Sequence, residues 1–329
     1  MYIGDSANHR VRKITASTSV VNTIAGIGTM GYSGDNSQAT AAAIAYPTGV
    51  NLDSSGNVYF GDTAYNVIRK ITVSTGVITT VAGTGSTSGE YSGDNVQATA
   101  ATLNNPVDVV LDSFGNLYIS DRHNYRIRKV TMSTGVITTV VGTGTSSSTG
   151  DGGAATSATI KGACASRFDS SGNYYITECG AVSVDDGNRI RKVVTVTTDI
   201  PTSAPSIQPT SATPSIQPTS YPSLSPHSIS VISTIAGTGT ASHSGDNGQA
   251  TSATMNHPAG IAIDSSGNVY FSDCYNNRVR KITVSTGIIT TYAGTGSASY
   301  GGDGSIASSA VLFTPNGLCI DTSGNNNCS

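Results

Sequence analysis

Residues 53–85 read DSSGNVYFGDTAYNVIRKITVSTGVITTVAGTG, a sequence that recurs with small changes along the chain. It contains three runs rich in β-branched and aromatic residues, at 58–62, 67–73 and 77–82, each bounded by turn residues such as Gly, Asn, Ser and Asp. The run PTGVNLD at 47–53 precedes it. The stretch therefore predicts a unit of four short strands, which we name strand A (47–53), strand B (58–62), strand C (67–73) and strand D (77–82).

The unit occurs five times along the chain. An acidic residue closes strand B in every copy: Asp5, Asp62, Asp121, Glu178 and Asp273. A Gly-Asp loop between strand D and the next strand A also recurs. Because a single four-stranded sheet cannot bury both of its faces, the copies are expected to stack on one another. We predict an all-β fold, a β-propeller of about five four-stranded blades.

The chain begins at strand B of one copy and stops just after strand A of another. We expect the C-terminal strand A to complete the sheet begun by the N-terminal strands B to D, which closes the ring and removes exposed edges. A five-bladed propeller and a fragment of a six-bladed one both agree with this pattern.

Two interruptions lie in the fourth copy. The insert CGAVSVDDG follows Glu178, and a Pro/Ser/Thr-rich segment that contains PSIQPTS twice lies between strands C and D. Such a composition is typical of an extended stalk or linker. We predict propeller blades at 1–199, a stalk or loop at 200–229, and the remaining blades at 230–329. The segment either loops out of one propeller or links parts of two.

Composition excludes some classes of partner. The chain contains no apolar run long enough to span a membrane, and its net charge is −3. We therefore expect no membrane span and no nucleic-acid partner. The opening MYIGDSANHR lacks the apolar core of a secretory signal peptide.

The motif DSANHRVRK at 5–13 recurs as DRHNYRIRK at 121–129 and DCYNNRVRK at 273–281. Together with NHPAGIAIDSSGNVY at 256–270, it resembles the NHL repeat, and the resemblance covers nearly the whole chain outside the Pro-rich segment. It implies a β-propeller, commonly six-bladed, that is often a binding module and occasionally a lyase, a hydrolase or a receptor sensor domain.

Charged residues concentrate in the repeated positions. Most of the 17 Lys and Arg residues belong to strand C, where they either form a phosphate-binding surface or pair with the acids that end strand B; we favour the pairing. Gly-Asp loops such as SGDN at 33–36 either bind calcium or form turns in which Asp bonds its own backbone, and we favour the turns. His9 occupies the place that Asn66, Tyr125 and Asn277 hold, so it is interpreted as a repeat position.

Two pairs of cysteines flank turns between strands A and B. Cys164 and Cys179 lie on either side of the turn at 171–172, and Cys319 and Cys328 on either side of 323–324. This spacing places the members of each pair directly opposite each other, so two disulfides are feasible, while free buried thiols remain the alternative. Disulfides and a stalk together would place the protein outside the cell.

Functional residues are sought among the departures from the repeat. In a propeller, the B–C turns and D–A loops share one face, which we call the loop face. Our site hypothesis names the residues that break the repeat there: Arg122, His123, Asp185 and Asp186. We predict a non-catalytic binding scaffold, extracellular or on the cell surface, that recognises a protein or glycan through this face. The sequence offers no catalytic set, metal-ligand set or cofactor motif; the alternative is a metal-dependent lyase or hydrolase at the propeller channel.

Overall fold

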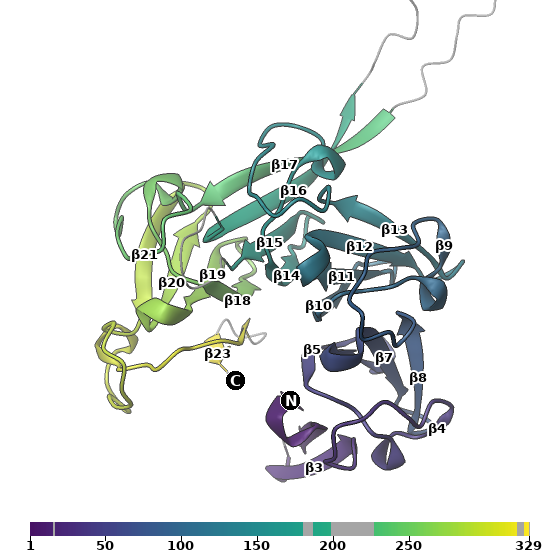
Figure 1. Ribbon diagram of the computed structural model, residues 1–329. Helices are drawn as coiled ribbons and strands as arrows, with labels where there is room; N and C mark the ends of the chain where they lie inside the picture. The colour runs from purple at the N-terminus through teal and green to yellow at the C-terminus, as the bar shows by residue number, and fades with distance from the viewer. Residues whose placement is uncertain (16, 180–186, 199–226, 321–325, 329) are drawn as a thin grey trace, which may run out of the picture.

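The computed structural model describes residues 1–15, 17–179, 187–198, 227–320 and 326–328. In these residues, the secondary structure consists of β-strands and short 3-10 turns. The strands form antiparallel sheets that follow one another as five blades around a central axis (Figure 1). The predicted all-β propeller fold is confirmed.

The described strands have the following bounds. Blade one contains β1 (Tyr2–Asp5), β2 (Arg10–Thr15) and β3 (Val20–Ala25). Blade two contains β5 (Pro47–Leu52), β6 (Val58–Asp62), β7 (Val67–Thr72) and β8 (Val77–Ala82), with β4 (Ser37–Gln38) beside β8. Blade three contains β10 (Pro106–Leu111), β11 (Leu117–Asp121), β12 (Arg126–Thr131) and β13 (Val136–Val141), with β9 (Val96–Gln97) beside β13.

Blade four contains β14 (Ala163–Phe168), β15 (Tyr174–Glu178), β16 (Arg189–Thr198) and β17 (His227–Ala236). Blade five contains β18 (Pro258–Ile263), β19 (Val269–Asp273), β20 (Arg278–Thr283) and β21 (Ile288–Ala293), and a hairpin of β22 (Leu318–Ile320) and β23 (Asn326–Cys328) follows.

Strand A of each blade lies nearest the axis, because β5, β10, β14 and β18 contact one another in succession. Glycine permits this close approach of backbones. A Cβ on Gly49 of β5 would lie 2.5 Å from the Cα of Asp108 in the next blade, and one on Gly260 of β18 would lie too close to the carbonyl oxygen of Asn316. The inner strands therefore pack tightly enough to form the wall of a narrow central space.

The hydrophobic core is divided into layers between neighbouring blades. In the layer between blades two and three, Ile68 and Ala82 pack with Val109, Leu117 and Ile119, all of them buried. Equivalent layers lie between the other neighbouring blades. Each blade thus buries its faces against its neighbours, as expected for copies that cannot fold alone.

The expected closing pair of strands is not formed among the described residues. Strand β22, the C-terminal strand A, pairs with β23, and the sheet of blade one keeps three strands. The physical reason lies in the sequence after β22, which reads DTSGNNNC and resembles the turn and strand B of a complete unit. Strand A therefore pairs with the strand that follows it, because closing a short hairpin costs less conformational entropy than meeting a distant strand.

The strands on either side of the Pro/Ser/Thr-rich segment belong to one sheet. β16 and β17 pair in antiparallel register up to Thr198 and His227. Both ends of the segment therefore lie at blade four. Residues 199–226 are outside the described residues, and the division of the chain at 199 and 230 stays a prediction.

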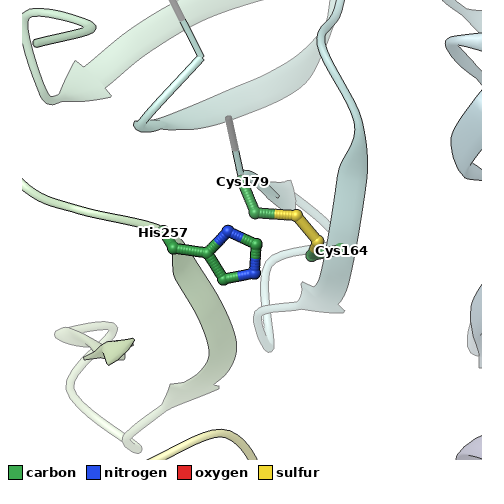
Figure 2. Close-up of side chains that lie close together, drawn as sticks. All are labelled: Cys164, Cys179 and His257. Atoms are coloured by element: carbon green, nitrogen blue, oxygen red, sulfur yellow. A yellow bond between two sulfur atoms is a disulfide. The ribbon is translucent and has the colours of Figure 1, made fainter. Parts of the chain in front are cut away.

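A disulfide joins Cys164 and Cys179 in blade four, with 5.9 Å between their Cα atoms (Figure 2). The expected direct opposition of the two cysteines is wrong. Ala163 is opposite Glu178, and a register shift between Ala163 and Ala165 makes Cys164 the extra residue of a bulge. Because a bulge re-aims the side chain of the extra residue, the sulfur of Cys164 still reaches Cys179.

The second cysteine pair has a different register from the one predicted. Cys319 is opposite Asn327, and Cys328 is opposite Leu318. The side chain of Cys328 lies outside the described residues, so the second disulfide stays a prediction.

Candidate binding site

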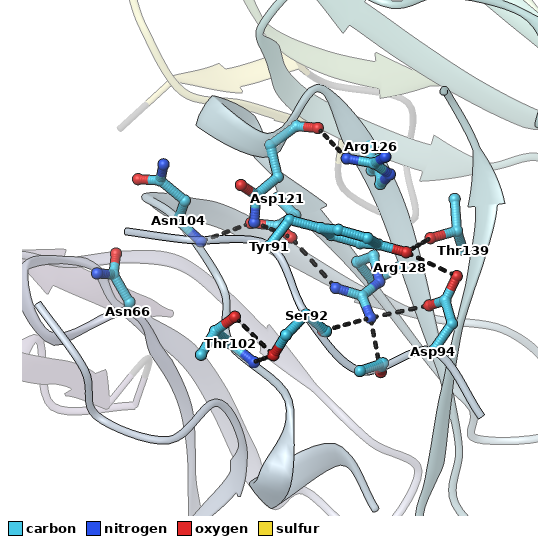
Figure 3. A network of polar contacts seen from close by, with 12 residues as sticks. Asn66, Tyr91, Ser92, Asp94, Thr102, Asn104, Asp121, Arg126, Arg128 and Thr139 are labelled. Atoms are coloured by element: carbon cyan, nitrogen blue, oxygen red, sulfur yellow. Dashed lines mark hydrogen bonds and ion pairs between the residues drawn. The ribbon is translucent and has the colours of Figure 1, made fainter. Parts of the chain in front are cut away.

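Four arginines of strand C are completely buried, and each contacts two acidic residues. In blade three, Arg128 lies 2.9 Å from Asp94 and 3.5 Å from Asp121, while the ring of Tyr91 covers its guanidinium (Figure 3). Blades two, four and five repeat the two-acid arrangement. The four arginines are Arg69, Arg128, Arg191 and Arg280. Their interpretation as partners of the strand-end acids, rather than as a phosphate-binding surface, is confirmed.

The acids that end strand B are structural residues of the blades. Burial raises the pKa of Asp121 to about 6, although the backbone N–H of Asn104, 2.7 Å from its Oδ1, and Arg128 both favour the ionised form. Burial likewise raises the pKa of Glu178 to about 7, against the attraction of Arg191 at 2.9 Å. Asp62 and Asp273 have the same surroundings, whereas Asp5 pairs with the half-exposed Arg12 in blade one.

The Gly-Asp loops have a different role from the one expected. Asp35, Asp94, Asp151 and Asp246 each accept a hydrogen bond from the buried arginine of the following blade. The expectation that these carboxylates bond their own backbone is therefore wrong, because the arginine brings a charged donor into each loop. The self-bonded turns occur instead after strand A, where Asp53 accepts from the backbone N–H groups of Ser55 and Asn57.

A second repeated contact links each blade to the next. Asn66 has a left-handed backbone with φ 54°, and its Oδ1 accepts a hydrogen bond from the N–H of Asn105 at 2.7 Å. His9 has φ 52° and accepts in the same way from Tyr46 at 3.3 Å, which confirms that it fills a repeat position. Blade three has Tyr125 there, which lacks an amide oxygen to accept this bond. The junction between blades three and four therefore departs from the repeat.

A cavity of about 540 Å³ lies at the centre of the propeller, lined mainly by residues of the inner strands. Arg122, Cys164 and His257 border it toward the loop face. Deeper in the wall, Asp108 pairs with Arg167 at 3.3 Å and accepts a 2.8 Å hydrogen bond from the N–H of Ser166. The charges in the deeper wall therefore neutralise each other.

Arg122 is the predicted site residue that the structure places at this cavity. It begins the 3-10 turn η5 (Arg122–Asn124) and is half-buried. Burial lowers the pKa of its guanidinium, and the hydroxyl groups of Tyr275 and Tyr125 oppose this effect. Within the described residues, no carboxylate forms an ion pair with Arg122. Its charge is thus available to a ligand from the cavity.

The other predicted site residues do not join Arg122. His123 is exposed on the same turn, with its Nε2 3.3 Å from the side-chain nitrogen of Asn105, and it does not border the cavity. Partial desolvation of its ring by neighbouring side chains lowers its pKa, and the nearby charge of Arg122 lowers it further. Asp185 and Asp186 lie outside the described residues, so their assignment to the site stays a prediction.

The site hypothesis did not include His257 or Tyr275. The ring of His257 stacks on Tyr275 at 4.7 Å, and one of its nitrogens lies within 4.8 Å of the sulfurs of Cys164 and Cys179 (Figure 2). In the described part of the chain, this is the one group of three or more His, Cys, Asp or Glu side chains close enough to share a metal ion. The sequence shows that His257 stands where other blades have Tyr46 and Asn105. It does not show that the ring of His257 packs against blade four.

These side chains come from three consecutive blades. Arg122 follows strand B of blade three, the disulfide joins β14 of blade four to the residue that follows β15, and His257 and Tyr275 belong to blade five. They combine a cation, an aromatic ring and a rigid cross-link at one mouth of the cavity. Such a surface can hold a polar ligand in a fixed orientation.

Comparisons with known proteins agree with the propeller fold. Residues 232–300 match the family model described as the teneurin NHL domain. The protein SUPPRESSOR OF QUENCHING 1, chloroplastic, of Arabidopsis thaliana is 36% identical over 81 residues, which are 24% of this chain and 8% of that protein.

Solved structures with similar folds include two that cover nearly the whole chain. An auxiliary nutrient binding protein from Bacteroides thetaiotaomicron has a TM-score of 0.60 and 16% identity, over 98% of this chain and 61% of that one. A gluconolactonase from Xanthomonas campestris has a TM-score of 0.56 and 11% identity, over 100% of this chain and 78% of that one. At these identities the likeness shows the fold alone. Within the described residues, no helix has the length and apolar character needed to cross a membrane.

Proposed function

We propose that this NHL-repeat β-propeller is a non-catalytic binding scaffold, extracellular or on the cell surface, that recognises a protein or glycan through its loop face. One observation carries the proposal. The side chains that recur in every blade are occupied within the fold, whereas Arg122, His257 and the disulfide of blade four depart from the repeat and border one mouth of the central cavity, with Tyr275 stacked on His257.

The chemistry of this mouth favours an acidic ligand. A half-buried guanidinium without an ion-pair partner among the described residues can donate two parallel hydrogen bonds to a carboxylate. Tyr275, stacked on His257, is 42% exposed and offers an apolar ring face with a hydroxyl group. A sugar acid presents both a carboxylate and a C–H face, so we favour a glycan with acidic sugars over a protein surface.

The proposed location rests on the disulfide and on composition. Disulfides persist in oxidising compartments such as the extracellular space. The Pro/Ser/Thr-rich segment between β16 and β17 has the composition of a stalk, and both of its ends lie at blade four.

The test is a glycan array that carries matched neutral and acidic oligosaccharides, probed with the biotinylated chain. We expect capture on acidic glycans, and a loss of affinity of at least about tenfold in Arg122→Met, because a charge-assisted hydrogen bond is removed. Lys70→Met is the matched control: it removes one positive charge from strand C, where Lys70 packs over the ring of Tyr59. Binding that is equal on neutral glycans, or unchanged in Arg122→Met, contradicts the proposal; capture of secreted proteins that depends on Arg122 would favour the protein ligand.

A further inference from the structure

We infer that Cys164, Cys179 and His257 form a redox-gated zinc site, closed to metal while the disulfide is present and able to bind one Zn²⁺ ion when it is reduced. The three side chains meet where blade four packs against blade five (Figure 2). The inference concerns the chain's own redox chemistry and does not depend on the proposed function.

The geometry of the three donors is close to that of a zinc site. Their ligand atoms all lie within 4.8 Å of one another. Tetrahedral zinc with Zn–S bonds of about 2.3 Å and Zn–N bonds of about 2.0 Å separates its donors by roughly 3.4–3.8 Å. Small side-chain rotations therefore suffice to bring two thiolates and one imidazole to coordination distance.

Interactions other than the disulfide hold His257 in place. Its backbone is left-handed, with φ 56°, and its N–H donates to Oδ1 of Asn188 at 2.8 Å. Its ring lies nearly parallel to that of Tyr275, with an interplanar angle of 26°. Because none of these contacts uses a cysteine sulfur, the imidazole is expected to keep its position after reduction.

The backbones of the two cysteines are also fixed independently. Cys164 is the bulge residue of β14, and both of its neighbours, Ala163 and Ala165, pair with β15. The N–H of Cys179 donates to the carbonyl oxygen of Gly162 at 3.3 Å. Reduction therefore frees two thiols that remain near each other and near His257.

The chemistry is a thiol–disulfide exchange followed by metal binding. A dithiol reductant transfers two electrons and two protons to the Cys164–Cys179 bond, so two thiols form and the reductant becomes a disulfide. Zn²⁺ then replaces the two thiol protons, which are released to solvent. In the oxidised form both sulfurs are bonded to each other and supply no thiolate.

The site has an open side. Cys164 and His257 both border the central cavity, so a fourth ligand can approach from there. Arg122 borders the same part of the wall, since a Cβ on Gly162 would lie 3.7 Å from its Nε. Three protein ligands and one open position are typical of zinc sites that bind a water or another donor.

The experiment compares the full chain in its oxidised and reduced forms. Protein reduced with dithiothreitol under nitrogen is freed of reductant by gel filtration, incubated with zinc chloride, dialysed and analysed for zinc by mass spectrometry. We expect one zinc ion per chain in the reduced protein and none in the oxidised protein. Cobalt(II) in place of zinc should give thiolate-to-metal charge-transfer absorption in the reduced form alone.

Variants assign the ligands. Cys164→Ser and His257→Asn should each lose the metal; asparagine tolerates a left-handed backbone and is the residue that blade three carries as Asn105. Cys274→Ser and Cys319→Ser should keep it. Equal zinc in the oxidised chain, no zinc in the reduced chain, or retention by Cys164→Ser overturns the inference. If reduction loosens the fold, zinc should still raise the melting temperature of the reduced wild type and not that of Cys164→Ser; the absence of this difference also overturns it.

Discussion

Replacement of Arg128 by methionine tests the role of the buried arginines most sharply. The variant keeps an unbranched side chain that fills the space of the arginine stem, so the main change is the loss of the charged head. Asp121 then has no cationic partner, although it is completely buried. The hydrogen bonds from Arg128 to the carbonyl oxygen of Gly93, at 3.0 Å, and to Asp94, at 2.9 Å, are also lost.

The magnitude follows from these contacts. Removing one partner of a buried ion pair costs about 3–5 kcal/mol of unfolding free energy, because the remaining charge stays desolvated. Burial already raises the pKa of Asp121 to about 6 in the presence of Arg128, and loss of the arginine raises it further. Asp121 should then take up a proton near neutral pH. The cost of the substitution should therefore be smaller at pH 5 than at pH 8.

The assay is urea unfolding followed by circular dichroism and tyrosine fluorescence, since the chain has no tryptophan. Lys129→Met is the matched control on the same strand. Lys129 pairs with Asp112 at 3.8 Å and is partly exposed, so we expect a cost below about 1 kcal/mol. If Arg128→Met is destabilised no more than Lys129→Met, the buried cluster does not hold the loop to the blade and the reasoning is refuted.

Three further predictions follow from the same structure. Burial raises the pKa of four strand-end acids: to about 7 for Asp62 and Glu178, and to about 6 for Asp121 and Asp273. Between about pH 4 and 7 the folded state therefore binds more protons than the unfolded state. The contribution of these four acids to the unfolding free energy is fully present below about pH 4 and is lost as the pH rises through about 6 to 7. A higher unfolding free energy at pH 8 than at pH 5, measured by urea unfolding, would contradict this. The double variant Cys164→Ser, Cys179→Ser should lose about 3 kcal/mol of unfolding free energy, measured by urea unfolding without zinc, because the disulfide closes a short loop in the unfolded chain. Asn66→Ala should lose about 2 kcal/mol in the same assay, because the N–H of Asn105 loses its acceptor and alanine disfavours a left-handed backbone; an unchanged midpoint would show that this contact does not join the blades.

The sequence predicted the features that every blade must form in the same way. The acid at the end of strand B and the arginine of strand C recur because each blade has to satisfy the same buried groups, and the structure shows them paired in blades two to five. The place of His9 was predictable for the same reason, since its left-handed backbone occurs at one position of each copy. Local pattern and repetition therefore determine most of the propeller.

Features that depend on register or on contacts between blades could not be predicted. Asp94 lies in a loop and accepts a hydrogen bond from Arg128 of the following blade. The spacing of the two residues in the sequence does not show that they form this bond. The bulge at Cys164 shifts the pairing by one residue, which the symmetric spacing of the cysteines conceals.

The candidate site itself was predicted only in part. Arg122 was identified because it breaks the repeat, and the structure places it at the central cavity. His257 approaches the disulfide only because blade five packs against blade four, and its distance in sequence from Cys179 contains no sign of this contact. Asp185 and Asp186 remain predictions.

We propose that the repeated residues maintain the fold and that the departures from the repeat bind the ligand. The most direct measurement determines both unfolding free energy and capture on acidic glycans for Arg122→Met and Arg128→Met. We predict that Arg122→Met keeps its stability and loses capture, whereas Arg128→Met loses stability and, under conditions where it remains folded, still captures the glycan. A loss of stability in Arg122→Met as large as that in Arg128→Met, or capture that survives the loss of Arg122, would contradict the account.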